Sequence, residues 1–272
     1  MEKQNLTTGF QHVDDSAHQF LIQFLEDVSV FPPAVEGFEI QLKSLDIKEG
    51  DHVLDVGCGI GIQALAMAEL AGARGRVVGT DLSNMMIEVA RNKAAGSELP
   101  VEFLTADAVA QPFPDGSFNC IRTERVLMYI KDARVVLKEF KRLLRPGGRV
   151  VIFDFDWDAM VIAHRDKALT RRIVRYGSDS FPNGRVGGEL FRHMKYEGFK
   201  NVTVRPTSYS GSGKVTLGLV KRVYEGILQT GIANGVFTQM EIEDWWRAFE
   251  EDGREGNLYA SFTGFIVSGT KD

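Results

Sequence analysis

Val53-Leu54-Asp55-Val56-Gly57-Cys58-Gly59-Ile60-Gly61 is a short apolar run that leads directly into a glycine-rich turn. Its β-branched and aliphatic residues predict a buried strand over 52–56, and a helical pattern follows over 63–71. Glycines let the backbone approach a ligand closely, because they lack Cβ and can adopt positive φ. Amides at the helix start would face that ligand. The stretch therefore predicts a ligand-binding strand–turn–helix unit, although a turn that serves only packing would look similar.

The spacing of these glycines distinguishes between ligands. Gly57, Gly59 and Gly61 form G-x-G-x-G, whereas the dinucleotide fingerprint G-x-G-x-x-G would need glycine at Ile62. A pyrophosphate-binding loop is therefore disfavoured, and an NAD(P)-dependent oxidoreductase becomes a secondary alternative.

Acidic residues follow the next two predicted strands. Asp81 ends the strand over 77–80, where one carboxylate can accept hydrogen bonds from both hydroxyls of a ribose. A helix cap is the alternative for Asp81, but Ser83 competes for that role. Asp107 follows the strand over 101–105, where it could accept an adenine amino proton. A turn or cap is the alternative for Asp107.

The middle of the chain alternates short apolar runs with helical patterns, which is typical of parallel strands joined by helices. Five strands are predicted over 52–56, 77–80, 101–105, 118–122 and 150–155. Helices are predicted over 63–71, over 84–95 and after Asp132, which is placed to cap its helix. The pattern therefore predicts a parallel sheet covered by helices.

Beyond residue 155 the alternation stops, and we expect two insertions, at 157–186 and 208–258. The elements expected around them are a helix over 189–197 and strands over 201–206 and 260–269. The second insertion contains an amphipathic repeat and a capping-box pattern formed by Thr238 and Glu241. Both insertions are expected to hold helices.

Composition restricts the partners of the protein. The 32 basic and 37 acidic residues leave a net charge of −5, so the chain has no overall positive field for nucleic acid. Cys58 and Cys120 have no cysteine or histidine at metal-ligand spacing. The loose set His12, Asp14, Asp15 and His18 is interpreted as surface rather than as a metal site, so no metal is expected.

No apolar run approaches the roughly 20 residues that cross a bilayer. The N-terminal sequence MEKQNLTTGF also lacks a basic region followed by an apolar core. We therefore expect no stable membrane insertion and a cytoplasmic protein, either a monomer or a homodimer.

Five runs together resemble class I S-adenosylmethionine-dependent methyltransferases, in the order and spacing of that family: VLDVGCGIG, VVGTDLS, FLTADA, FPDGSFNCIRTERVLMY and LLRPGGRVVI. The resemblance covers about residues 40 to 155. It implies an α/β fold with a Rossmann-like, doubly wound, seven-stranded sheet that is mostly parallel, with an antiparallel last strand and helical lid insertions. The chain is expected to be a single domain over 1–272, with an N-terminal helical cover at 1–45 and a cofactor-binding core at 46–156.

The resemblance also implies that S-adenosylmethionine is the cofactor and S-adenosylhomocysteine its product. By that resemblance, Asp55, Gly57, Gly59 and Gly61 surround the methionine part, Asp81 the ribose, Leu82 and Met86 the adenine face, and Asp107 and Ala108 the adenine edge, while Arg122 and Thr123 offer backbone groups to the methionine amine. The segments 123–127 and 154–157 further resemble a bacterial small-molecule subgroup, UbiE-like and natural-product methyltransferases. This favours methylation of an aromatic, quinone or polyketide-like metabolite.

Methyl transfer from a sulfonium mainly requires alignment and exclusion of water, so a general base is optional. Candidates for such a base are Glu124, Asp156, Asp158 and His164. The alternatives are a turn for the two aspartates and a structural or surface role for His164, which lies in a predicted helix. Trp157 and Tyr176 are expected to contact the substrate, although packing is an equal alternative for Trp157. A protein that keeps the cofactor as a scaffold for another reaction remains a further alternative.

Overall fold

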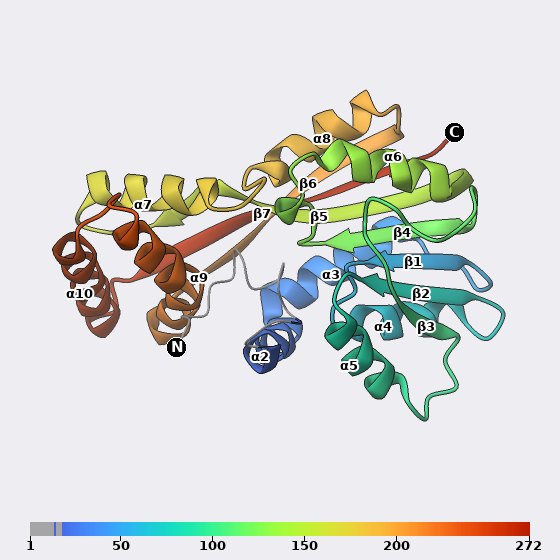
Figure 1. Ribbon diagram of the computed structural model, residues 1–272, viewed down its shortest axis with the longest axis horizontal. Helices are drawn as coiled ribbons and strands as arrows, with labels where there is room; N and C mark the ends of the chain where they lie inside the picture. The colour runs from blue at the N-terminus through green and yellow to red at the C-terminus, as the bar shows by residue number, and fades with distance from the viewer. Residues whose placement is uncertain (1–13, 15–17) are drawn as a thin grey trace.

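The computed structural model describes Asp14 and residues 18–272. Within these residues, seven strands form one sheet in the order β3-β2-β1-β4-β5-β7-β6 (Figure 1). Strands β1 to β5 pair in parallel, and β7 runs antiparallel to both of its neighbours. The predicted α/β architecture, with its mostly parallel sheet and antiparallel last strand, is confirmed.

The strands are β1 (His52–Val56), β2 (Arg76–Asp81), β3 (Val101–Thr105), β4 (Phe118–Glu124), β5 (Leu144–Ile162), β6 (Lys200–Ser212) and β7 (Tyr259–Thr270). The helices are α2 (His18–Ser29), α3 (Pro32–Leu45), α4 (Ile62–Ala71), α5 (Asn84–Ala94), α6 (Ala133–Leu143), α7 (Lys167–Asp179), α8 (Val186–Tyr196), α9 (Gly213–Ala233) and α10 (Gln239–Glu255), with a short 3₁₀ helix η1 (Leu127–Tyr129). None of the helices in the described part of the chain is long and apolar enough to cross a membrane.

Helices α6 and α10 begin where the sequence predicts. The Asp132 side chain accepts from the Arg134 amide at 3.0 Å and caps α6. Thr238 and Glu241 form the reciprocal capping box of α10. Such caps satisfy amides that the first helical turn leaves without partners. These helix starts are therefore determined by local residues.

The strand order reverses direction between β1 and β4. From β1 the chain continues outward through β2 and β3, whereas β4 and β5 lie on its other side. Ligands in open α/β sheets bind beyond the carboxyl ends of the strands at such a point. The fold therefore places the residues that follow β1, β2 and β4 where a ligand is expected to bind.

Two of the expected strand ends are wrong, because both strands are longer than their apolar runs. β5 continues past residue 155 to Ile162, where Val161 pairs with Ser261 of β7. β6 likewise extends beyond Pro206 to Ser212 along the same partner. His164, expected in a helix, lies in the connection between β5 and α7. Pairing with the long β7 extends both strands, and that long-range partner has no local signature.

Helices α7, α9 and α10 form a lobe at one end of the molecule, carried by the extended parts of β5, β6 and β7 (Figure 1). Much of the aromatic mass of the two insertions packs inside this lobe. Trp245 is buried, stacks on Phe249 with ring centroids 5.4 Å apart, and donates to the Thr170 hydroxyl at 2.9 Å. The helical character of the insertions is confirmed, and their aromatic residues largely form a core.

Close packing of α8 on β5 gives a test of the fold. A Cβ atom at Gly187 would lie 2.6 Å from the Asp154 carbonyl oxygen and 2.6 Å from the Phe155 carbonyl carbon, and the backbone cannot move away cheaply. We expect Gly187→Ala to lower the free energy of unfolding by about 1–3 kcal/mol. Gly218→Ala, on α9 with no atom of the described residues within 4 Å of its Cβ position, should instead raise it by about 0.5–1 kcal/mol. Urea unfolding of the two variants measures both, and equal effects would contradict this packing.

Candidate active site

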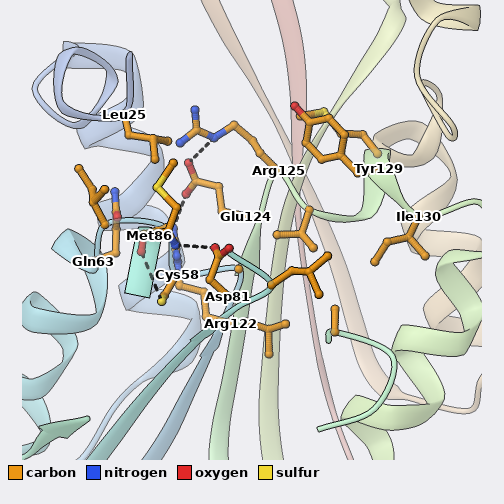
Figure 2. A pocket seen from close by; sticks show the side chains of 18 of the residues that line it. Leu25, Cys58, Gln63, Asp81, Met86, Arg122, Glu124, Arg125, Tyr129 and Ile130 are labelled. Atoms are coloured by element: carbon orange, nitrogen blue, oxygen red, sulfur yellow. Dashed lines mark hydrogen bonds and ion pairs between the residues drawn. The ribbon is translucent and has the colours of Figure 1, made fainter. Parts of the chain in front are cut away.

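A cavity of about 640 Å³ opens at the carboxyl ends of the parallel strands (Figure 2). The glycine turn, the end of β2 and the loop at 106–109 form one side. The end of β4, η1, β5 and α9 form the other side, and α2 contributes Phe24 and Leu25. The cavity thus lies where the reversal of strand order predicts a ligand.

The glycine turn has the backbone that its sequence predicts. Gly57, Gly59 and Gly61 have φ angles of 72°, 52° and 79°. A Cβ atom at Gly57 would overlap the Val126 side chain, and one at Gly61 would lie 2.8 Å from the Phe103 ring. Gly57 and Gly59 line the cavity. Gly61 instead allows α4 to pack against β3. Close approach of a ligand therefore concerns Gly57 and Gly59, and packing concerns Gly61.

Asp81 lies at the cavity wall, and its carboxylate is held by the backbone. Oδ2 accepts from the Gly59 amide at 2.9 Å and Oδ1 from the Ser83 amide at 3.0 Å. The Ser83 hydroxyl, not Asp81, caps α5 by accepting from the Met86 amide at 3.1 Å. Burial raises the pKa of Asp81, and these amides oppose that rise. The carboxylate is thus oriented without serving as the helix cap.

The residues expected around an adenine lie together beside Asp81. Leu82, Met86, Asp107 and Ala108 all line the cavity. Met86 is buried, whereas Leu82 is 63% exposed. Oδ1 of Asp107 accepts from the Val109 amide at 3.0 Å, which also gives this residue the turn role considered from the sequence.

A buried charge network closes the cavity below the glycine turn. The Arg122 guanidinium donates to Asp55 Oδ1 at 2.8 Å and to Gln41 Oε1 at 2.9 Å, and it also pairs with Glu124 (Figure 2). Gln41 in turn donates to Glu124 at 2.9 Å. The sequence had suggested only backbone roles for Arg122, and Gln41 of α3 had no motif that could reveal it. The tertiary fold alone assembles this network.

The two carboxylates of the network differ in their electrostatics. Burial raises the pKa of Asp55, against the effect of Arg122. Burial also acts to raise the pKa of Glu124, but Arg122 and Arg125 overcome it, so that pKa lies below its usual value. Glu124 is therefore a firmly ionised carboxylate engaged with two arginines, which makes it a poor proton acceptor.

Aromatic rings form the wall opposite the glycine turn. Trp157 stacks on Phe181 with ring centroids 4.7 Å apart and planes 11° apart. Trp157 also contacts Met128 of η1 through its indole nitrogen, at 3.3 Å from Sδ. Phe155 and Tyr129 line the same region. This side of the cavity is flat and apolar, as a small aromatic ligand requires.

The four residues Asp156, Asp158, His164 and Tyr176, which the sequence suggested as a base or as acceptor contacts, lie away from the cavity lining. Asp156 alternates with Phe155 and Trp157 on β5, so its side chain leaves the opposite face of the strand. His164 stacks on Trp245, and Tyr176 packs edge-on against Phe237. Asp158 pairs with Arg185 at 3.3 Å. Of the backbone pair proposed at the end of β4, Arg122 lines the cavity and Thr123 is fully buried beside it.

The N-terminal segment contributes one residue that the sequence interpretation missed. Asp14, grouped there with surface residues, accepts from the Asn84 and Met85 amides at 3.1 Å each and from the Ser83 hydroxyl. It thereby covers the start of α5 beside the cavity, where a carboxylate is favoured by the helix dipole. His12 and Asp15 lie outside the described residues, as does the side chain of His18.

Comparisons with known proteins agree with this geometry. A family model described as a methyltransferase domain matches residues 54–152. Demethylmenaquinone methyltransferase of Staphylococcus aureus (strain JH9) is 31% identical over 188 residues, which cover 62% of this chain and 76% of the relative. An uncharacterised 37.1 kDa protein from a Streptomyces fradiae transposon is 36% identical over 196 residues, 71% of this chain and 56% of the relative. The chain thus spans little more than half the length of that second relative.

The solved structure of the YcgJ protein from Bacillus subtilis has the same fold, with a TM-score of 0.62 and 18% identity over 87% of this chain and 98% of that one. This chain belongs to the class I S-adenosylmethionine-dependent methyltransferase family.

The residues of the cavity fit S-adenosylmethionine on two structural observations. Asp55 is fully buried directly behind the lining residues Val56 and Arg122, and its Oδ2 has no hydrogen-bond partner among the described residues, as an acceptor for an ammonium group would. Gly57 and Gly59 line the cavity with positive φ angles, so the backbone of the turn meets a ligand without an intervening Cβ. Asp55 and the glycine turn would hold the methionine part, and Asp81 the ribose.

Asp154 is a buried carboxyl that joins β5 to η1, part of the cavity wall. It is fully buried on β5 and accepts from the Met128 amide of η1 at 3.1 Å and from the Phe155 amide at 2.9 Å. Burial raises its pKa from 3.8 to about 7, although the amide hydrogen bonds oppose that rise. The carboxyl therefore binds its proton more tightly in the folded protein than in the unfolded chain.

The stability that this proton confers is present below about pH 4 and is lost as pH rises through about 7. We expect Asp154→Asn, which cannot ionise, to become more stable relative to the parent protein by about 1–3 kcal/mol between pH 5 and pH 8. Urea unfolding at the two pH values measures this change. A stability difference that is independent of pH would mean that Asp154 ionises in the folded protein as it does in the unfolded chain.

Proposed function

We propose that this protein transfers a methyl group from S-adenosylmethionine to a small organic acceptor, of which aromatic, quinone or polyketide-like metabolites are favoured. One observation carries the proposal: a single cavity joins the glycine turn and Asp81 to the aromatic wall of Trp157 and Phe181. The proposed cofactor-binding and acceptor-binding surfaces are therefore opposite walls of one cavity, whose volume is about 640 Å³.

The residues of the chain align and enclose the reactants in this mechanism. Bound at the glycine turn, S-adenosylmethionine supplies an activated methyl group on a sulfonium centre. Asp55 would hold the methionine part of the cofactor and Asp81 its ribose, while Trp157 and Phe181 hold a flat acceptor against the opposite wall. Phe24 and Leu25 of α2 cover the cavity and exclude water.

The nature of the wall supports a flat acceptor. Stacked rings bind planar apolar molecules with little loss of side-chain entropy, because each ring has few rotatable bonds. The Staphylococcus aureus relative is a demethylmenaquinone methyltransferase, which favours a quinone-like acceptor here. Of the sequence-derived base candidates, Glu124 is held by arginines and Asp156 and His164 lie off the cavity lining, so the proposal assigns no general base.

Cofactor binding tests the first half of the proposal. S-adenosylhomocysteine should bind and raise the thermal midpoint, as any ligand of the native state must. Asp81→Ala should weaken that binding by about 1.5–3 kcal/mol, because it removes a charged acceptor for the ribose hydroxyls. Asp158→Ala, which removes a carboxylate outside the cavity, is the matched control in calorimetric titration. Unchanged affinity in Asp81→Ala would leave Asp81 as a turn residue only.

Transfer itself is tested with a donor that carries a trideuterated methyl group. The enzyme is incubated with this donor and extracts of aromatic metabolites, and products are followed by mass spectrometry. We expect a metabolite that has exchanged one hydrogen for the labelled methyl group, in step with formation of S-adenosylhomocysteine. A product isomerised at unchanged mass, with the donor intact, would instead support the scaffold alternative. Stabilisation by NADH but by neither sulfur compound would support the oxidoreductase alternative.

A further inference from the structure

Arg125 occupies the point where the chain leaves β4 and turns into η1. Its φ angle is +56°, in the left-handed region that side chains other than glycine rarely adopt. Its amide donates to the Phe153 carbonyl at 2.9 Å, which holds the turn in place. An L-residue in this conformation costs about 1 kcal/mol relative to glycine, and such costs gather at functional sites. Glycine would adopt this backbone at lower cost, so the arginine side chain is the feature that distinguishes this position.

The Arg125 guanidinium lines the cavity and keeps a hydrogen-bond donor unused among the described residues. Its side chain is 16% exposed, and Nε lies 3.2 Å from Glu124 Oε1. That contact lacks hydrogen-bond geometry, so the buried Nε makes no hydrogen bond within the described residues. Glu124 lies between Arg125 and Arg122 and also accepts from Gln41 (Figure 2). Arg122 and Arg125 thus share the Glu124 carboxylate, and Arg122 also pairs with Asp55.

Arg125 lines the same cavity as an aromatic wall. Tyr129 lines the cavity beside Arg125, and the stacked Trp157 and Phe181 line it as well. Burial raises the pKa of the Tyr129 and Tyr209 hydroxyls, and the positive charge of Arg125 opposes that rise in both. A cation of low exposure and a flat apolar wall therefore belong to one cavity.

We infer that Arg125 selects acceptors that carry an anionic group, a carboxylate or an ionised phenol, on a flat apolar ring system. This inference rests on the proposed function and names the substrate class of the same site. The rings would pack on Trp157 and Phe181, and the anion would pair with the guanidinium. A neutral acceptor of the same shape would leave the poorly solvated cation without that compensation, which costs binding energy. The cofactor carboxylate is the other anion of the same chemistry, and the test separates the two.

The probes are 1-naphthoate and 1-naphthamide, which share one ring system and differ in charge. Each is titrated calorimetrically into the complex of the protein with S-adenosylhomocysteine. We expect naphthoate to bind about tenfold more tightly than naphthamide, as a charge-assisted pair provides. Equal binding of the two, or binding of neither, would overturn the inference.

Variants assign that preference to Arg125. Arg125→Met should abolish it, whereas Lys131→Met, which removes the same charge from an exposed residue at the cavity rim, should retain it. Loss in both variants would indicate a general field rather than Arg125 and would overturn the inference. Arg125→Gly guards against misfolding, because glycine relieves the left-handed backbone. It should keep or raise the thermal midpoint and still abolish the preference.

The cofactor arm distinguishes the two sources of the anion. Affinity for S-adenosylhomocysteine should stay within about twofold in Arg125→Met, as separable sites require. A larger loss, with affinity for 5′-methylthioadenosine unchanged, would assign Arg125 to the cofactor carboxylate and overturn the inference. If the parent protein binds neither S-adenosylmethionine nor S-adenosylhomocysteine, the proposed function fails instead. Cofactor binding without a preference for the anionic probe contradicts only the acceptor class.

Discussion

The buried pairing of Arg122 with Asp55 is the interaction on which the site depends. The two residues are register partners on β4 and β1, the strands between which the strand order reverses, and both are almost fully buried. A buried charge that loses its partner costs about 3–5 kcal/mol. A shift in register between these strands would separate the pair, so the pairing favours the one alignment that brings the glycine turn and the end of β4 to the same edge.

The network around this pair also divides the cavity into regions. Asp55 keeps one buried oxygen without a partner among the described residues, while the other oxygen of Glu124 lies 3.2 Å from Arg125 Nε. Arg122 lies between the two carboxylates and keeps both ionisable groups close together without net repulsion. Asp55 and Arg125, to which we assign cofactor and acceptor binding as proposals, thus belong to one charge network, and Gln41 of α3 fixes its geometry through hydrogen bonds to two of its members.

The long ribbon of β5, β7 and β6 connects the site to the distal lobe. The inner part of β5 belongs to the parallel sheet, and its outer part alternates Phe155 and Trp157 toward the cavity with Asp156 away from it. Beyond that point the ribbon carries α7, α9 and α10, and α9 returns Val223 to the cavity lining. The aromatic residues of the lobe mostly pack against one another, so the lobe contributes few residues to the cavity lining.

The sequence alone determined the features that depend on local chemistry. The glycine spacing, the caps at Asp132, Ser83 and Thr238, and the acid at the end of β2 each need only a few adjacent residues, since steric freedom and helix-end amides are local properties. Only the tertiary structure decided the extent of β5 and β6, because pairing with β7 joins segments about one hundred and about fifty residues apart. For the same reason it alone brought Gln41 to Glu124 and Asp55 to Arg122, and it alone placed His164 and Tyr176 in the lobe. Side-chain neighbours across a fold are set by packing, which no spacing along the chain records.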